Sequence, residues 1–204
     1  ALSVVNGITC VASGAIVYQD NFDNVSVGLF TFPSPQVGTW VSGNSVVRTG
    51  TVVPPSAPNY LRNDRNGDAA PIIAGMKGDL AGSPLLPGTS VHAEATMYAF
   101  DGYPVFGRNV DATNLYPWDS ASGDGVVILS GSPGGTTVYA VGPTGGLVAT
   151  GLSHQINTWE KWAIEYVVGA SSFDVTVGGS TVTLGATHMK NSAATSVGAM
   201  FFDA

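Results

Sequence analysis

The stretch from residue 158 to 186 constrains the fold of this chain most strongly. Its first part, WEKWAIEYVV (159–168), has the period of two that is typical of a strand, and no apolar stripe at helical spacing competes with it. Two further β-rich runs follow, one after the small residues 169–172 and one after Gly178-Gly179, where a tight hairpin needs positive φ. The sequence therefore predicts three consecutive antiparallel strands, and their apolar face needs a second sheet to cover it.

The rest of the chain has the same β-prone character. Residues 90–100 alternate well and predict a central strand. Residues 37–42 and 45–53 read as two strands across a Gly43-Asn44 turn, and the run 53–58 contains three prolines, which cannot sit inside a sheet. Helical patterns are almost absent, apart from one turn expected within 187–194. Further strands are expected over 71–75, 125–130, 136–141 and 146–150.

Three groups of residues carry a family resemblance. The pattern W-x-x-W-x-I-x-Y, F-x-V-x-V and Gly-Gly within 159–179 resembles the late strands of concanavalin A-like (laminin G-like) jelly rolls. YQDNFD (18–23) resembles their first strand, and VGAMFFD (197–203) resembles their last strand, which in the family usually lies beside the first. The resemblance implies one all-β domain over 1–204, an antiparallel two-sheet β-sandwich of jelly-roll, concanavalin A-like type. It carries no catalytic signature, so it supports a fold rather than a function.

The composition limits the partners of such a domain. Only 10% of residues are charged, where about 25% is usual, and 44% are hydrophobic. This favours a surface partly covered by copies of the chain or by another assembly protein, although secreted Ser/Thr/Gly-rich sandwiches share the composition. The net charge of −7 without a basic patch argues against nucleic acid. No long apolar run predicts membrane insertion, and we expect an extracellular, cell-surface or virion-surface location.

The first 17 residues carry no charge and are β-prone. One interpretation is an ordinary first strand that pairs with the last strand. The other is that residues 1–13 form an N-terminal arm or strand-exchange segment, which adds to the sheet of a neighbouring copy by β-augmentation. The sequence leaves both interpretations open.

Catalytic patterns are weak in this chain. A retaining glycosidase needs two carboxylates on one face of a sheet, but Glu94, Glu160 and Glu165 each stand alone in an apolar strand and the family's Glu-x-Asp-x-x-Glu motif is absent. The three histidines lie in no recognisable motif: His92, His154 and His188. The sequence therefore predicts no catalytic residue and no required cofactor.

Structural calcium is one prediction for the acidic residues. The loop DRNGD places side-chain oxygens at positions one, three and five, from Asp64, Asn66 and Asp68. Gly75 stands where an EF-hand has its glutamate, and an Asx-rich turn explains the same spacing. The family resemblance implies a second calcium position, because Asp20 or Asp23 would neighbour Asp203 if the first and last strands pair.

Aromatic residues mixed with Asn and Asp between 101 and 119 predict a glycan site. Because prolines flank these aromatic residues, we expect them on exposed loops, where rings and amide groups recognise sugars. Capping of one end of the core explains the same residues equally well. The candidate glycan-binding residues are Tyr103, Asn114, Tyr116, Trp118 and Asp119.

These observations predict, first, a non-enzymatic extracellular or virion-surface structural subunit. It would self-assemble or decorate a larger assembly through its sandwich faces and its N-terminal strand. The alternatives are a lectin-like adhesion module that binds glycans, and a polysaccharide-cleaving enzyme that uses Glu94 and Glu165.

Overall fold

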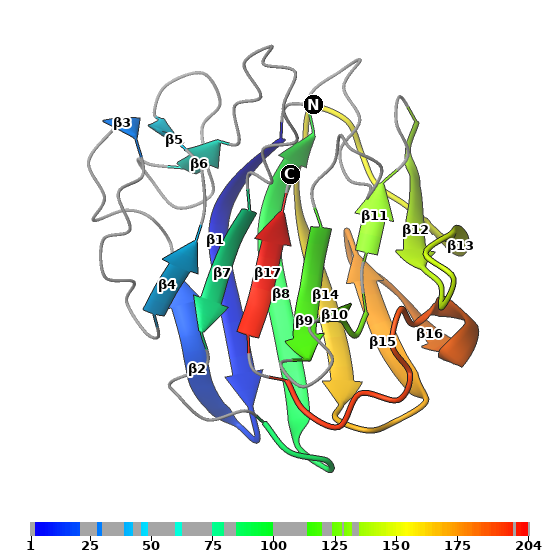
Figure 1. Ribbon diagram of the computed structural model, residues 1–204. Coiled ribbons are helices and arrows are strands. Elements are labelled where there is room, and N and C mark those ends of the chain that lie inside the picture. The colour runs from blue at the N-terminus through cyan, green and yellow to red at the C-terminus, as the bar shows by residue number, and fades with distance from the viewer. Residues whose placement is uncertain are drawn as a thin grey trace.

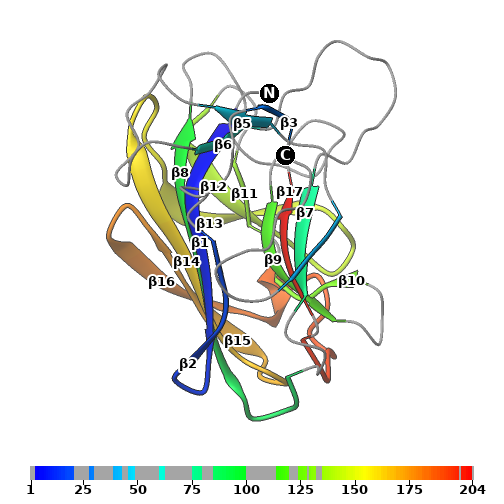
Figure 2. The same ribbon diagram turned by 90° about the vertical axis from the view of Figure 1, so that its left-hand side faces the viewer.

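The computed structural model describes residues 3–20, 28–29, 39–42, 46–48, 60–62, 75–79, 85–99, 114–119, 124–127, 129–131, 135–197 and 199–203. Over these ranges the chain is mostly β-strand, and the one described helix is the short 3-10 turn η1 (Ala186–His188). The strands form two antiparallel sheets, which lie as two layers in Figure 2. The all-β prediction is confirmed at this level.

Sheet A holds the long strands of the molecule (Figure 1). Its order is β16 (Ser180–Gly185), β15 (Ser172–Val177), β14 (Trp159–Val167), β8 (Ser90–Ala99), β1 (Ser3–Ala12), β6 (Tyr60–Arg62), β5 (Val46–Arg48) and β3 (Gly28–Leu29), with β2 (Ala15–Asp20) also paired to β1.

Sheet B covers the inner side of sheet A. Its order is β13 (Leu147–Ser153), β12 (Thr137–Val141), β11 (Leu129–Gly131), β9 (Asn114–Asp119), β17 (Ala199–Asp203), β7 (Gly75–Asp79) and β4 (Thr39–Ser42), with β10 (Asp124–Gly125) paired to β9.

The three strands predicted within 158–186 are confirmed as β14, β15 and β16, which pair in sequence order without a register shift. Gly178 and Gly179, in the turn between β15 and β16, have φ of 56° and 88°. Such angles suit glycine and match a primed hairpin turn. Local sequence alone therefore builds this edge of sheet A.

Inward side chains of both sheets form one apolar core. On β8, alternate residues are buried and the residues between them are partly exposed, as the period of two requires. The largest fully buried side chains are Trp162, Met97, Leu129 and Ile164. Sheet B, residues 126–127 after β10, and the segment after η1 close the core from the other side, through Val126, Val127, Leu129, Val138, Ala140, Leu152, Met189, Ala194 and Val197.

The N-terminal segment lies inside sheet A of its own chain. Residues of β1 pair with β8 along its whole length, from Ser3 opposite Ala99 to Ala12 opposite Val91. On its other side β1 pairs with β2 and β6. Within this chain, residues 3–12 therefore form a strand with neighbours on both sides.

Two predicted strand neighbours are wrong. The last strand, β17, pairs with β7 and β9 in sheet B, whereas β1 and β2 belong to sheet A. Likewise β4 pairs with β7 in sheet B, and β5 pairs with β3 and β6 in sheet A, so 39–48 is not a hairpin. A hairpin between β4 and β5 would contain few ladder bonds, because these strands have only 4 and 3 residues. Each of the two strands pairs instead with strands of its own sheet, β4 with β7 and β5 with β3 and β6.

Candidate functional site

The outer face of sheet A carries a group of charged and hydroxyl side chains that lie close together. On β8 and β14 the residues between the buried ones point away from the core, and β15 and β16 continue this pattern. We define the outer face of sheet A by eleven outward side chains: His92, Glu94, Thr96, Tyr98, Trp159, Lys161, Glu165, Asp174, Thr176, Thr181 and Thr183.

Strand register decides which of these residues meet. The β8–β14 pairing sets His92 opposite Glu165, and Glu94 opposite Ala163. The next pairings set Asp174 opposite Glu165, and Thr183 opposite Asp174. Because residues directly opposite in an antiparallel pair share one face with Cβ atoms about 4.5–5.5 Å apart, one polar row crosses four strands.

His92 joins two carboxylates at the centre of this row. Its Nδ1 is hydrogen-bonded to Glu165 Oε1, and its Nε2 lies 3.1 Å from Glu94 Oε2. Lys161 Nζ lies 3.0 Å from the other oxygen of Glu94. We call these four residues the His92 cluster. Ionised carboxylates only accept hydrogen bonds, so both contacts are satisfied together when both ring nitrogens donate, as they do in the imidazolium.

The surroundings of His92 act on its pKa in opposite directions. Partial burial of the ring, the largest single influence, lowers the pKa because it disfavours the charged form. The hydrogen bonds and charges of Glu165 and Glu94 favour the charged form. Together they outweigh the burial, so the pKa of His92 is raised above its ordinary value of 6.5.

Threonine hydroxyls continue the row beyond the His92 cluster. Thr183 Oγ1 donates to Asp174 Oδ1 at 2.5 Å, and the hydroxyls of Thr176 and Thr181 are 2.7 Å apart. Asp174 stands opposite Glu165, and like charges in that position repel. Thr183 on one side and His92 on the other provide hydrogen bonds that offset this repulsion.

An aromatic pair lies on the same outer face. Tyr98 and Trp159 are directly opposite each other, with ring centroids 5.4 Å apart and planes inclined at 60°. Both are half-buried. Tyr98 is six residues from His92 along β8, a distance of roughly 20 Å at strand geometry. The outer face of sheet A therefore has an aromatic end and a charged end.

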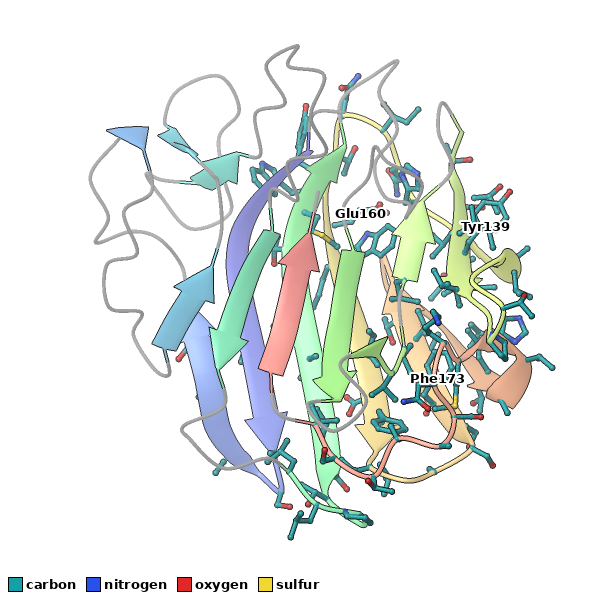
Figure 3. All side chains as sticks on the ribbon, viewed as in Figure 1. Tyr139, Glu160 and Phe173 are labelled. Atoms are coloured by element: carbon teal, nitrogen blue, oxygen red, sulfur yellow. The ribbon has the colours of Figure 1, made fainter. Side chains whose placement is uncertain are left out.

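Glu160 belongs to the opposite, inward face, where Figure 3 labels it. Its Oε2 accepts a hydrogen bond of 2.7 Å from the backbone N–H of Gln155. Next to that residue, His154 is buried, with its ring 6.0 Å from that of Trp162 and its Nδ1 3.3 Å from the Gln155 carbonyl. Among the described residues, His154 Nε2 has no hydrogen-bond partner. Glu160 thus holds the turn before β14 and does not join the other two glutamates.

The predicted isolation of the glutamates is wrong for two of the three. Glu94 and Glu165 lie on adjacent strands and meet through His92. A signal for part of this was present in the sequence, since His92 and Glu94 are two residues apart in an alternating strand, and Lys161 and Glu165 are four apart. The register that brings the two pairs together links residues 73 positions apart.

Four of the predicted glycan-binding residues lie on a strand and not on the expected loop, and their role in glycan binding stays a prediction. Asn114, Tyr116, Trp118 and Asp119 belong to β9, which lies inside sheet B between β17 on one side and β10 and β11 on the other. Pro117 stands opposite Met200 of β17. On the other side the described pairs use Leu115, Trp118 and Asp119, so the ladder is interrupted near the proline. Such an interruption accommodates a missing N–H. Tyr103 lies outside the described residues.

The predicted calcium positions fall mostly outside the described ranges. Asp64, Asn66, Asp68 and Asp23 are among the residues that are not described. Asp20 pairs with Ile8 in sheet A, whereas Asp203 pairs with Gly75 and Asn114 in sheet B. The strand pairing assumed for the second position is therefore wrong. Within the described part of the chain, no group of three or more His, Cys, Asp or Glu residues could hold a metal ion.

Comparison with known proteins does not assign the chain to a family. No protein-family model matches the chain, and a search of curated proteins finds no significant match. In the described ranges, no helix is long and apolar enough to cross a membrane.

Proposed function

We propose that this protein is a non-enzymatic β-sandwich module of concanavalin A-like, jelly-roll type that binds a glycan on the outer face of sheet A, outside the cell. One observation carries the proposal: the Tyr98–Trp159 pair shares a sheet face with a continuous row of hydrogen-bonding side chains. Sugars present apolar C–H faces and a rim of hydroxyls. Aromatic rings complement the former, and carboxylates, imidazole and hydroxyls complement the latter.

The charges on this face favour a polar ligand over a second protein face. Cores of protein–protein interfaces are depleted of charged residues, whereas His92, Glu94, Lys161, Glu165 and Asp174 lie together on the outer face of sheet A. Three carboxylates against one lysine and one histidine also make the face acidic. Neutral sugars or amino sugars fit it better than sulfated or uronate-rich ones.

The arrangement of the carboxylates supports binding over cleavage. A glycosidase places its two carboxylates on either side of the glycosidic bond. Here the imidazole of His92 occupies the space between Glu94 and Glu165 and is hydrogen-bonded to both. A sugar could not lie between the two carboxylates unless the ring of His92 moved away.

A second candidate function is the self-assembling structural subunit, and a different surface favours it. Ile16, Leu86 and Val167 are 48%, 63% and 42% exposed. They lie at one end of sheet A, because Ser13 N–H donates to the Ser90 carbonyl, Ser90 stands opposite Val167, and Gly88 N–H of the Leu86 turn donates to the Val168 carbonyl. We call these three side chains the apolar tip. Exposed apolar groups of this kind mark contact sites for copies of the chain or for another assembly protein.

Glycan binding is tested with the purified chain on an array of neutral and amino-sugar polysaccharides, followed by calorimetry on the ligands that bind. Trp159→Ala should weaken binding about tenfold, which corresponds to about 1.4 kcal/mol. Tyr139→Ala is the matched control, because Tyr139 is a half-buried outward aromatic residue on sheet B (Figure 3). Failure of the unmutated chain to bind any glycan, or equal losses in the two variants, would refute the proposal.

Assembly is tested separately by light scattering at increasing concentration. If the apolar tip joins copies of the chain, the unmutated protein should form oligomers. Leu86→Ser should then shift it toward a mass near 20.8 kDa. Leu147→Ser, at an exposed position on β13, serves as the control. If the unmutated chain stays monomeric at every concentration, assembly through the apolar tip is ruled out.

A further inference from the structure

His92 makes two hydrogen bonds that only one of its protonation states can satisfy. The imidazolium donates from both ring nitrogens, one to Glu165 and one to Glu94. A neutral imidazole has a single N–H, and its other nitrogen carries a lone pair. That lone pair would face a carboxylate oxygen, and the two would repel each other. Loss of the proton therefore breaks one of the two contacts.

The other partners of the two glutamates decide which contact breaks. Among the ion pairs between described residues, Glu94 has two partners, His92 and Lys161, whereas Glu165 has His92 alone. Glu165 also stands opposite Asp174, and these two carboxylates repel each other. Without the hydrogen bond from His92, Glu165 would lose the contact that offsets this repulsion. We therefore expect the neutral ring to keep its Nδ1–H on Glu165. Glu94 then separates from Nε2 and stays with Lys161.

His92 is the group of this network that titrates near neutral pH. The charged groups that face it are Glu94 on its own strand, Lys161 and Glu165 on β14, and Asp174 beyond them on β15. On β1 the residues in register with His92 and Glu94 are Val11 and Thr9, which do not titrate. Among the side-chain types of this network, imidazole is the one whose ordinary pKa lies near neutral pH.

We propose that proton loss from His92 opens the outer face of sheet A for its ligand, a regulation that rests on the proposed glycan-binding function. In the protonated state the His92 cluster carries two positive and two negative charges, and its carboxylates and imidazole are bonded to one another. After proton loss, one Glu94 oxygen and the His92 Nε2 lone pair become free acceptors for sugar hydroxyls. Neutral glycans should therefore bind more tightly above the pKa of His92 than below it. The raised pKa of this residue places the change near neutral pH.

The ligand-free chain tests the switch by itself. In NMR titrations the chemical shifts of the His92 ring and of the Glu94 side-chain carboxyl should change together with pH, with a shared midpoint above pH 6.5. Glu165→Gln should move the His92 midpoint to lower pH, because a carboxylate that stabilises the imidazolium is removed. The proposed switch would be overturned if the His92 midpoint stays unchanged in Glu165→Gln. It would also be overturned if the Glu94 chemical shift does not change while the His92 ring titrates.

Calorimetry at pH 5.5 and pH 8.0, with a neutral polysaccharide selected on the array, tests the consequence for binding. We expect about tenfold tighter binding at pH 8.0, the value of one hydrogen bond to a charged group. His92→Gln should remove this dependence, and His188→Gln should retain it, because His188 contacts Thr187 and the Ala149 carbonyl, away from the cluster. Equal binding at both pH values would overturn the regulation and leave the proposed function standing. No binding at either pH would refute the proposed function and the ligand part of this inference, while the NMR titrations still decide the switch.

Discussion

Replacement of Gly178 by alanine tests how tightly Glu160 is held inside the sandwich. An added Cβ at Gly178 would lie 2.5 Å from Glu160 Oε1, and Gly178 has a φ of 56°. The left-handed backbone conformation costs a non-glycine residue about 1 kcal/mol. The clash then pushes away a buried carboxylate whose other oxygen accepts the Gln155 N–H. Loss of a hydrogen bond to a charged group costs about 1.5–3 kcal/mol.

The total destabilisation expected for Gly178→Ala is therefore about 2.5–4 kcal/mol. Because 1 kcal/mol lowers Tm by about 2–4 °C in a domain of this size, thermal unfolding should show a drop of roughly 5–15 °C. Gly179→Ala is the matched control, since Gly179 has a φ of 88° but no atom within 4 Å of its added Cβ. That variant should lose only about 1 kcal/mol.

A double-mutant cycle isolates the contact with Glu160. In a Glu160→Ala background the added Cβ at Gly178 meets no carboxylate, so Gly178→Ala should there cost only about 1 kcal/mol. Equal Tm values for Gly178→Ala and Gly179→Ala would refute the reasoning. They would mean that the Glu160 carboxylate rotates away without losing its hydrogen bond to the turn.

Two further predictions concern pH and calcium. The His92 cluster should stabilise the fold most below pH 6.5, where the imidazole is protonated in both folded and unfolded states, provided that the carboxylates are ionised. This contribution disappears as the pH rises through the raised pKa of His92. Because the side chains of His92 and Glu165 are 29% and 55% exposed, solvent screening limits it to less than about 1 kcal/mol. Urea unfolding of the unmutated chain and of His92→Gln should therefore differ more at pH 5.5 than at pH 8.5, and a larger difference at pH 8.5 would contradict the sign. If the DRNGD loop binds calcium, excess calcium should raise Tm relative to EDTA by several degrees, and Asp64→Asn should remove the increase; identical Tm values with calcium and EDTA would contradict the calcium prediction.

The proposed site depends on side chains that hold one another in place. Every member of the His92 cluster is hydrogen-bonded or ion-paired to a residue of its own strand or of the neighbouring strand, so these four side chains hold one another in place without a ligand. Pre-ordered side chains lose less conformational entropy on binding. The same mutual bonding, however, occupies the acceptors that a sugar would use. Loss of the proton from His92, which would free one of these acceptors, would reconcile an ordered face with the proposed binding of a sugar.

Several features of this protein were predictable from sequence alone because their causes are local. The period of two in 159–168 placed Trp162, Ile164 and Tyr166 on one face and Lys161 and Glu165 on the other, as the structure has them. Gly178-Gly179 predicted a tight hairpin, since only a few residues can adopt the φ values that such a turn needs. These outcomes follow from the chirality and pleat of the backbone, which act within a few residues.

Tertiary structure alone decided which strands that are distant in the sequence lie side by side. A β-ladder accepts almost any β-prone partner, so the short strands β4 and β5 joined different sheets, and β9 entered sheet B despite Pro117. The meeting of His92 with Glu165 depends on the same long-range choice of partner and register. Backbone hydrogen bonds are nearly indifferent to sequence, and the burial of one complete apolar face against another selects the pairing. The faces of single strands were therefore readable in advance, and the site formed between strands was not.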